Sequence, residues 1–502
     1  MVRVSDIIPL SEVEKWNTED IVLINAGTGQ GKTTFVKDIL IEYCKENNKS
    51  ILFLVNRIAL KKQTKKDIEK KEKNYIANVR LTSYQAITRL LLKNKNNPDK
   101  AKAIAHFDYI VCDETHWFFS DALFNNTTDL MWNWLINNSN SIKILMTATA
   151  LLPKKYIKEV VKKKVKEYKL TTDYNKFIKT LYFYKNDKTI EKILFNLPKD
   201  ERALYFCGAD KAYTLSKLLP DAKFYCSENN KLYKHADEDT FKSIIEKMNF
   251  ECQILCTTSV LDNGVNFQDT SIKHIIIDYF DLDEIQQMIG RKRLNINNID
   301  DTFTLYIKNL TNQGLNRIRN TNNYLLKQAD YLEENGEIEF TNKYFKKSVN
   351  NIIDTFTGED NQIHRKVNKM MYTKIQNLIE IIQKMLKRKK DGYKQAVITR
   401  LKYDKKNVFD LDTELDGSIL QEYLNSLIGI KLFKEEQKKL KDFLTTNDDL
   451  FNPAKTDHKS LGLNSINGYF MDNGLAYAVE SNIENSRKSE YYKKTYWIIS
   501  KK

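Results

Sequence analysis

Long apolar runs are absent from this chain of 502 residues. No stretch of about 20 apolar residues could span a bilayer, and residues 1–6 lack the apolar core of a signal peptide. Cysteine is scarce as well, because only six occur and none forms a Cys-x-x-Cys pair. This argues against a disulfide framework and against the common zinc-site spacings, so we expect reduced thiols in the core. We therefore predict a soluble, cytoplasmic protein with no membrane partner.

Proline and arginine are also scarce. The six prolines leave the span between Pro220 and Pro453 free of proline, which permits long helices there. Arginine supplies only 13 of the 81 basic residues behind the net charge of +15. The lysine excess has two interpretations that composition leaves open: an AT-rich coding bias on a solvated surface, or a footprint for a polyanion. The 41% hydrophobic and 29% charged residues exclude collagen-like, mucin-like and wholly disordered chains.

Short β-branched runs alternate with helical patterns over the first 310 residues or so. Near-continuous apolar runs separated by helices are typical of strands buried on both faces of a parallel sheet. The first group of predicted strands comprises residues 21–25, 51–55, 109–113 and 142–146. After a lysine-rich stretch at residues 154–169, a second group comprises residues 180–184, 203–207, 253–257, 274–278 and 303–307. The pattern predicts two consecutive α/β domains.

The apolar spacing changes near residue 312 from a period of 2 to about 3.6, which predicts a helical region. The segment after residue 450 differs again, because a helical pattern at residues 465–471 precedes β-type runs at 476–479 and 496–499 around a basic loop. A helix followed by a hairpin with a charged tip resembles a winged helix. The predicted domains span residues 1–172, 173–311, 312–450 and 451–502.

A glycine-rich loop, Ala26-Gly27-Thr28-Gly29-Gln30-Gly31-Lys32-Thr33, follows the first predicted strand and precedes a helical pattern. Glycines permit a tight turn whose backbone N–H groups, with the helix N-terminus, cradle phosphates. In such a loop Lys32 reaches the β- and γ-phosphates, and the Thr33 hydroxyl is a ligand for Mg²⁺. Strand, loop, Gly-Lys-Thr and helix occur in the required order, so the segment predicts a nucleotide site rather than a turn that merely begins a helix.

A second chemical motif, Asp113-Glu114-Thr115-His116, stands at the carboxyl end of another predicted strand. At that place Asp113 can hold Mg²⁺ and Glu114 can polarise the attacking water, which phosphoryl transfer requires. An Asp-Glu pair at a strand end is by itself often a helix cap. Combined with the phosphate loop, the pair predicts hydrolysis of a nucleoside triphosphate.

The Asp-Glu-Thr-His segment fits the DExH signature, and the chain resembles the superfamily 2 DExH-box helicases over about residues 20 to 310. Further segments are similar to motifs of that family in the family's order: residues 54–60 (Ia), 81–85 (the next strand-binding segment), 147–149 (III), 203–219 (IV), 257–266 (V) and 287–293 (VI). The resemblance implies two RecA-like parallel-sheet domains in tandem, followed by the helical region and the winged-helix-like C-terminus. It also implies ATP and Mg²⁺ in the cleft between the two domains.

The resemblance assigns roles to individual residues. The catalytic set that it implies is Lys32, Glu114, Gln287 and Arg291, with Arg291 as an arginine finger, and its magnesium ligands are Thr33 and Asp113. The nucleotide contacts that it implies are Gly29, Gln30, Gly31, Lys32, Thr33, Thr34, Asp262, Gly264 and Arg293. The family has a second arginine four residues after the motif VI glycine, where this chain has Leu294. Arg293 stands one residue early, so its role as a second finger or as a surface residue stays open.

The expected nucleic-acid contacts complete the prediction. Residues expected to face the phosphates of a strand are Arg57, Thr82, Ser83, Thr257 and Thr258, and the basic C-terminal loop adds Arg487 and Lys488 beside Tyr491 and Tyr492. No adenine-recognition motif precedes the phosphate loop; Trp16 is either a base-stacking residue or a core residue, and ATP is the default nucleotide.

We predict an NTP-dependent nucleic-acid helicase or translocase, with DNA favoured over RNA and a single strand or a fork as its ligand. Two alternatives stay open. One is an ATP-driven duplex translocase or remodeller that does not separate strands. The other is an ATP-switched DNA-binding adaptor whose partners are the replication or defence proteins of a phage or mobile element.

Overall fold

The computed structural model describes residues 2–56, 78–93, 106–123, 125–261, 265–293, 301–344, 352–358, 360–446, 461–472 and 475–501. Three predicted site residues, Arg57, Asp262 and Gly264, lie outside these ranges. The chain divides into two compact units, one of residues 1–181 with 193–408 and one of residues 182–192 with 409–502. Among the helices of the described residues, none combines the length and the apolar character needed to cross a membrane.

The first sheet has six parallel strands in the order β3-β2-β4-β5-β1-β6. Their bounds are β1 Ile21–Asn25, β2 Ile51–Val55, β3 Val79–Ser83, β4 Tyr109–Cys112, β5 Ile142–Thr147 and β6 Lys166–Lys169. Alternate residues of the central strands belong to two separate apolar clusters, one on each face of the sheet. This explains why the strands are apolar almost throughout.

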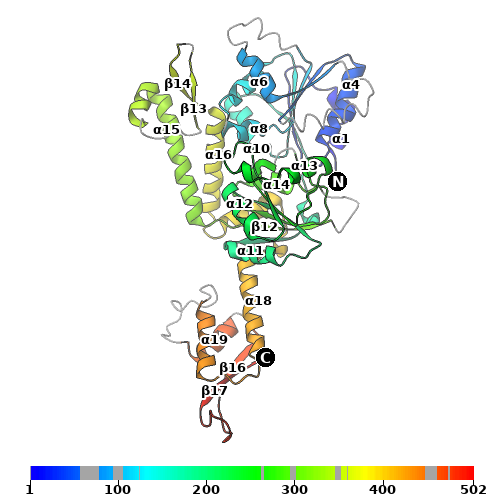
Figure 1. The fold of residues 1–502 in the computed structure, drawn as a ribbon. Helices are drawn as coiled ribbons and strands as arrows, with labels where there is room; N and C mark the ends of the chain where they lie inside the picture. The colour runs from blue at the N-terminus through cyan, green and yellow to red at the C-terminus, as the bar shows by residue number, and fades with distance from the viewer. Residues whose placement is uncertain are drawn as a thin grey trace. The chain divides into compact units, whose positions relative to one another are not determined.

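Helices cover both faces of this sheet (Figure 1). One cluster includes side chains of α1 (Val4–Ile7), α2 (Leu10–Val13), α3 (Lys32–Phe35) and α4 (Ile41–Glu46), with a π-helical turn at Val36–Leu40 between the last two. The other includes α6 (Tyr84–Lys93), α8 (Trp117–Ser120), α9 (Thr128–Asn137) and α10 (Leu151–Tyr156). Trp16 is a core residue that packs on Phe35 and donates to the Tyr168 hydroxyl at 3.0 Å, so the base-stacking interpretation was wrong.

The second sheet has the order β15-β7-β12-β11-β8-β10-β9. The bounds of its strands are β7 Ile178–Tyr184, β8 Arg202–Phe206, β9 Ala222–Tyr225, β10 Ile254–Thr257, β11 Ile272–Ile277, β12 Phe303–Lys308 and β15 Val408–Asp410. The run β12-β11-β8-β10-β9 is parallel. Its associated helices are α11 (Asp187–Phe195), α12 (Ala209–Leu218), α13 (Glu238–Lys247) and α14 (Leu282–Ile289). Two parallel sheets in sequence confirm the predicted α/β class and the tandem RecA-like arrangement.

The region after residue 311 is mainly helical, as predicted, with α15 (Asn312–Tyr344), α16 (Lys369–Leu386) and α17 (Gly392–Leu401). Gly336 interrupts α15 with a φ of +81°. The prediction of a mostly helical region did not include the hairpin between α15 and α16, where β13 (Ile353–Thr357) and β14 (Ile363–Val367) pair in antiparallel fashion. Ile353 and Val367 lie opposite each other in this hairpin and are both buried in the core that covers one face of the first sheet.

The C-terminal unit contains α18 (Leu411–Ser426), α19 (Lys434–Thr446), α20 (Leu463–Asp472) and the antiparallel pair β16 (Tyr477–Ile483) and β17 (Thr495–Lys501). Leu432 forms an isolated antiparallel bridge with Trp497, in which the two residues exchange backbone hydrogen bonds of 2.8 and 2.9 Å. The helix α20 followed by the β16–β17 hairpin agrees with the helix-and-hairpin pattern predicted for residues 451–502. All three helices share one core with the hairpin, so the predicted boundary at residue 451 divides elements that pack together.

Three further details differ from the sequence prediction or agree with it. The lysine-rich stretch 154–169 contains part of α10 and the edge strand β6, whose polar residues carry no strand signal. The strand β9 was also missed, since only four residues form it. The six cysteines are all free and buried, which agrees with the expected core thiols.

Candidate nucleotide-binding site

The glycine-rich loop joins the carboxyl end of β1 to the first turn of α3. Gly29 and Gly31 have φ values of +84° and +83°, a conformation that only glycine adopts without strain. The Gln30 side chain closes the loop from within, because the Gly27 N–H donates to Gln30 Oε1 and Gln30 Nε2 donates to the Thr171 carbonyl at 3.3 Å. These two hydrogen bonds of the Gln30 side chain fix the conformation of the loop.

Lys32 lies buried at the centre of this loop. Its Nζ donates to the carbonyl oxygens of Ala26 and Gly27 at 2.9 and 3.3 Å. Burial lowers the pKa of Lys32, although Glu114 and Asp113 act in the opposite direction. The two carbonyls thus hold the ammonium group at the place where a phosphate loop receives its anion.

Asp113 and Glu114 follow β4 at the same edge of the sheet. The Asp113 N–H donates to the Leu54 carbonyl at 2.9 Å, and Glu114 adopts a left-handed φ of +52° that turns the chain away from the strand. Burial and repulsion from Glu114 raise the pKa of Asp113 to about 7. Burial also acts to raise the pKa of Glu114, but Lys32, His116 and Arg291 outweigh it and lower that pKa to about 2. Glu114 is therefore the carboxylate that stays ionised.

The second sheet's domain contributes two arginines from the segment that follows α14. Arg291 is buried, donates from Nε to the Gln287 carbonyl at 3.2 Å, and places Nη2 at 3.9 Å from Glu114 Oε1. Arg293 approaches the phosphate loop so closely that a Cβ on Gly29 would lie 3.1 Å from its Nη1. Burial is the main cause that lowers the pKa of Arg293 to about 10, and Arg291 adds to it.

A chain of polar contacts runs from Glu114 to the second domain. Glu114 Oε2 lies 3.4 Å from His116 Nδ1, which is 3.3 Å from the Thr147 hydroxyl. Thr147 in turn accepts from the Thr149 N–H at 3.0 Å. Gln287 Nε2 completes the chain by donating to the Thr149 hydroxyl at 3.2 Å. The carboxylate and α14 are therefore linked through buried side chains.

The phosphate loop, the two carboxyls and the two arginines line one cavity of about 230 Å³. Its lining residues are Thr28, Gly29, Gly31, Lys32, Thr33, Thr34, Asp113, Glu114, Asn266, Arg291 and Arg293. Two buried polar atoms around it, Asn266 Oδ1 and Arg293 Nη1, have no hydrogen-bond partner in the described structure, and Glu114 Oε2 accepts no hydrogen bond there beyond its 3.4 Å ion contact with His116 Nδ1. Buried polar atoms without a hydrogen bond are rare in folded proteins, and their presence fits a site that binds a polar ligand.

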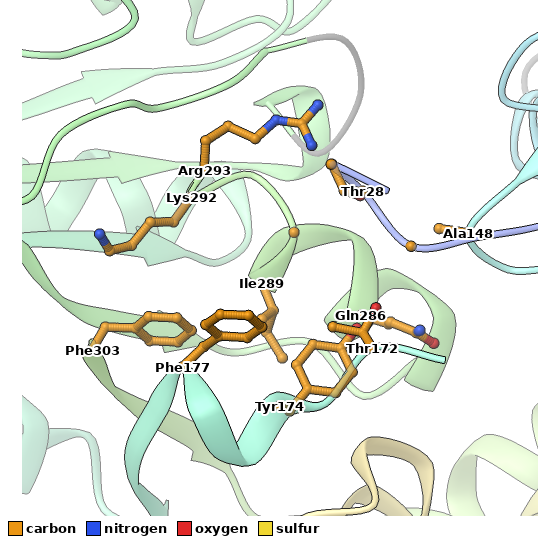
Figure 2. Close-up of a pocket in the computed structure, with 13 residues that line it drawn as sticks. Thr28, Ala148, Thr172, Tyr174, Phe177, Gln286, Ile289, Lys292, Arg293 and Phe303 are labelled. Atoms are coloured by element: carbon orange, nitrogen blue, oxygen red, sulfur yellow. The ribbon is translucent and has the colours of Figure 1, made fainter. Parts of the chain in front are cut away.

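A second, largely apolar cavity adjoins the loop on its other side, and Figure 2 shows it between Thr28 and the rings of Tyr174, Phe177 and Phe303. Gly290 of the second domain lies directly against Thr28 of the phosphate loop, because a Cβ at position 290 would lie 2.6 Å from the Thr28 hydroxyl. The phosphate loop and motif VI are thus in direct apposition.

The comparisons with known proteins agree with this geometry. The family described as "Type III restriction enzyme, res subunit" matches residues 5–152, which contain the phosphate loop and the Asp-Glu-Thr-His segment. Over these residues the chain is similar to that family. The predicted family resemblance is confirmed. A comparison with curated proteins gave no match.

Solved structures similar to this chain include three with TM-scores near 0.4. They are the Escherichia coli DEAH/RHA helicase HrpB (13% identity, TM-score 0.40, 62% of this chain and 43% of that one), S. cerevisiae Dbp5 bound to RNA and ADP BeF3 (16%, 0.43, 62% and 85%) and a type I restriction enzyme HsdR fragment from Vibrio vulnificus YJ016 (17%, 0.40, 60% and 62%). This chain therefore spans less than half the length of HrpB.

The structure treats the remaining predicted residues differently. Thr82 and Ser83 end β3, and Thr257 and Thr258 end or follow β10, so all four lie at carboxyl ends of strands. Thr257 is a correction: its hydroxyl is fully buried and donates to the Tyr225 carbonyl at 3.0 Å, so it is not free to contact a strand.

Other predicted residues lie apart from the nucleotide cavity or were missed. Gln30 turns its side chain away from the cavity toward Thr171. Arg487 and Lys488 are exposed in the turn between β16 and β17 of the C-terminal unit. Sequence reasoning missed Asn266 as a cavity residue, although it ends the segment similar to motif V.

Proposed function

We propose that this protein hydrolyses ATP with Mg²⁺ in the cavity between its two parallel-sheet domains and couples hydrolysis to movement on nucleic acid. The observation that carries the proposal is the convergence of Lys32, Glu114 and Arg291, from three separated segments, on one cavity. The cavity offers three cationic side chains against two carboxyls, which suits a polyphosphate accompanied by a divalent cation.

Each side chain has a defined task in this proposal. Lys32 and the backbone N–H groups of the loop hold the β- and γ-phosphates. Thr33 and Asp113 would hold Mg²⁺, which neutralises phosphate charge when bound. Glu114, ionised and turned into the cavity, orients a water for attack on the terminal phosphorus and accepts its proton.

Arg291 supplies positive charge from the second domain. Its guanidinium already lies 3.9 Å from Glu114, so it sits where charge accumulates on the transferring phosphoryl group. Gln287 lies on α14, the helix that precedes Arg291, and donates to Thr149 in the loop that follows β5. A change of nucleotide state is therefore expected to alter the contacts of both α14 and this loop. This linkage supports a coupling of hydrolysis to relative motion of the two domains.

The nucleic-acid ligand is proposed to contact the carboxyl ends of β3 and β10 and the basic turn of the C-terminal unit. Thr82, Ser83 and Thr258 remain as candidates, with Arg487 and Lys488 on the turn. Contacts of hydroxyls and cations to phosphate carry no sequence information, which suits a protein that moves along a strand. We favour DNA because the matching family is described as a restriction enzyme subunit.

A test of this proposal measures ATPase rate without polymer and with single-stranded DNA, duplex DNA and RNA in turn. Lys32→Ala is expected to abolish hydrolysis, and Glu114→Gln to bind ATP without turning it over, because an amide cannot accept the proton. Stimulation by DNA above RNA supports the proposal. A Glu114→Gln protein that hydrolyses ATP at the wild-type rate would show that Glu114 is not the base. A hydrolysis rate that no polymer changes would favour the ATP-switched adaptor.

The second candidate is an ATP-driven translocase on duplex DNA that does not separate strands. The family match favours it, since a type III restriction enzyme subunit is what residues 5–152 resemble. It uses the same nucleotide cavity and differs only in the polymer and the product of motion.

A further inference from the structure

The segment that carries Arg291 and Arg293 has an unusual residue between them. Lys292 is entirely buried, with 0% of its side chain exposed, and it forms an ion pair with Asp301, whose side chain is 1% exposed. Lys292 Nζ also donates to the Asp269 carbonyl at 3.3 Å. A buried pair of this kind contributes little net stability, because desolvation offsets the attraction. Its presence beside the nucleotide cavity therefore calls for another explanation.

The backbone of this segment is extended and held by a partner. The Phe267 N–H donates to the Arg291 carbonyl at 2.9 Å, and the Arg293 N–H donates to the Phe267 carbonyl at 2.7 Å. In extended backbone, side chains two residues apart point to one side and the residue between them points to the other. Figure 2 shows this for Lys292 and Arg293, which leave the chain in opposite directions.

The alternation gives the two arginines one shared face. Arg291 and Arg293 both line the cavity that contains Lys32 and Glu114. Lys292 is the residue that points away, toward Asp301, two residues before β12, and toward the loop before β11. The arginine that stands one residue early in the sequence thus reaches the cavity because the chain is extended rather than helical at this point.

We propose that the buried Lys292–Asp301 pair is a positioning device that fixes the segment 290–293, so that Arg291 and Arg293 face the nucleotide together. The inference rests on the proposed ATP hydrolysis and deepens it by assigning a positioning role to Lys292 and Asp301, which lie outside the set of nucleotide contacts. Lys292 touches no nucleotide and acts only through the arginines. Without this anchor, only the two backbone hydrogen bonds to Phe267 hold the segment, and the two guanidinium groups are less firmly positioned.

The principal test is Lys292→Met in the full-length protein, with kcat, KM for ATP and Tm measured together. Methionine keeps the length of the side chain and removes the charge. We expect kcat to fall by about tenfold or more, since small displacements of catalytic groups have such effects, and KM to change by less than about threefold. Lys211→Met is the matched control, because it breaks the 2.6 Å Lys211–Asp278 pair of the same domain away from the cavity. It should lower Tm without lowering kcat.

A second variant separates position from stability. Lys292→Met combined with Asp301→Leu removes both buried charges and should recover Tm, as apolar replacements of buried pairs often do. The proposal expects kcat to stay low in this double variant. Recovery of kcat together with Tm would overturn it and leave the pair as a stabilising contact only.

A double-mutant cycle with Arg293→Ala identifies the route of the effect. If Lys292 acts through the arginines, Lys292→Met should cost less in the Arg293→Ala background than in the wild type. An equal cost in both backgrounds, or wild-type kcat for Lys292→Met, would overturn the inference. A wild-type protein with no ATPase activity would instead refute the proposed function, so the two failures are distinguishable.

Discussion

Gly290 has an ordinary φ of −68°, so its backbone would accept any residue. Space is what selects glycine, because an added Cβ would lie 2.6 Å from the Thr28 hydroxyl and 2.9 Å from Thr28 Cβ. The contact joins the phosphate loop to the segment that carries the two arginines. At the scale of single residues, the absence of a side chain at position 290 therefore allows the phosphate loop and this segment to approach each other so closely.

Gly290→Ala is therefore expected to lower ATPase turnover by about tenfold or more, since the methyl group pushes the loop and the arginines apart. The measurement is kcat beside ATP affinity. Thr28→Gly made in the same chain should return part of the activity, and Thr28→Gly alone serves as the control. Wild-type turnover in Gly290→Ala would mean that the two segments do not meet in the working protein.

Lys143 presents a different residue-scale problem. It lies on β5 with no exposed surface, and within the described structure its Nζ has no hydrogen-bond partner. Burial is the main cause that lowers the pKa of Lys143 to about 8, with a contribution from Lys163. Above the unfolded pKa of about 10.4 the group is neutral in both states and has no effect on stability. As the pH falls toward 8, only the unfolded chain gains the proton, so stability falls and the cost is complete below that pH.

We expect Lys143→Met to raise the stability at pH 7 by about 1–2 kcal/mol, because it removes a buried charge that lacks a partner. The gain should shrink as the pH rises from 8 toward 10.5, where the wild-type lysine loses its proton in the unfolded chain as well. Thermal unfolding of both proteins at pH 7 and pH 10 measures the difference. A gain that does not depend on pH would assign the effect to packing alone.

At the scale of elements, the C-terminal unit has the winged-helix order but an unusual division of charge. The helix α20 has no lysine or arginine, and Asn467 is engaged with Val479 through bonds of 2.8 Å in both directions. The turn between β16 and β17 carries Arg487, Lys488, Lys493 and Lys494, all exposed. The turn, rather than α20, is therefore the element suited to phosphate.

The two tyrosines of this turn differ in their surroundings. Tyr491 stacks on Phe433 with ring centroids 4.0 Å apart, and Lys494 Nζ lies 5.4 Å from the centroid of the Tyr491 ring. Its ring is thus engaged and braces the turn instead of offering a free face to a base. Tyr492 remains 38% exposed, with Lys493 near its ring.

We expect replacement of Arg487, Lys488 and Lys493 by glutamine to weaken single-stranded DNA binding. The salt dependence should flatten by up to about 0.7 log-log units for each phosphate that the variant no longer neutralises. The matched control replaces three exposed lysines of α19 in the same unit, Lys434, Lys438 and Lys439, by glutamine. ATPase without polymer should be unchanged in both. Equal weakening in the two variants would indicate general charge rather than a site.

At the scale of the whole molecule, the two leading functions share every chemical group and differ in the product of motion. A helicase separates strands, whereas a duplex translocase displaces a third strand from a triplex. If the protein moves on duplex DNA without separating strands, we expect triplex displacement at least as fast as unwinding of a forked duplex. The paired assays use wild-type protein, with Glu114→Gln as the inactive control. Efficient unwinding without triplex displacement would reverse the preference.

The sequence alone determined the features that depend on neighbouring residues. The order of Gly29, Gly31 and Lys32 after an apolar run is a local pattern, as are the Asp113-Glu114 pair at a strand end and the alternation of the hairpin strands. Local patterns also gave the α/β class, because strands buried on two faces must be apolar throughout. The polar edge strand β6 and the hairpin β13–β14 were not predicted, since their strand conformation depends on the residues that they pack against rather than on their own sequence pattern.

Tertiary structure decided which groups meet. Arg293 stands one position before the place expected from the family, and only the extended backbone paired with Phe267 turns it toward the loop. Thr257 has the residue type for a strand contact, yet burial commits its hydroxyl to Tyr225. The surroundings of Lys292, Gly290 and Lys143 come from segments distant in sequence, so no spacing reveals them. Contacts between segments far apart in the chain depend on the relative placement of whole elements, which a local pattern does not encode.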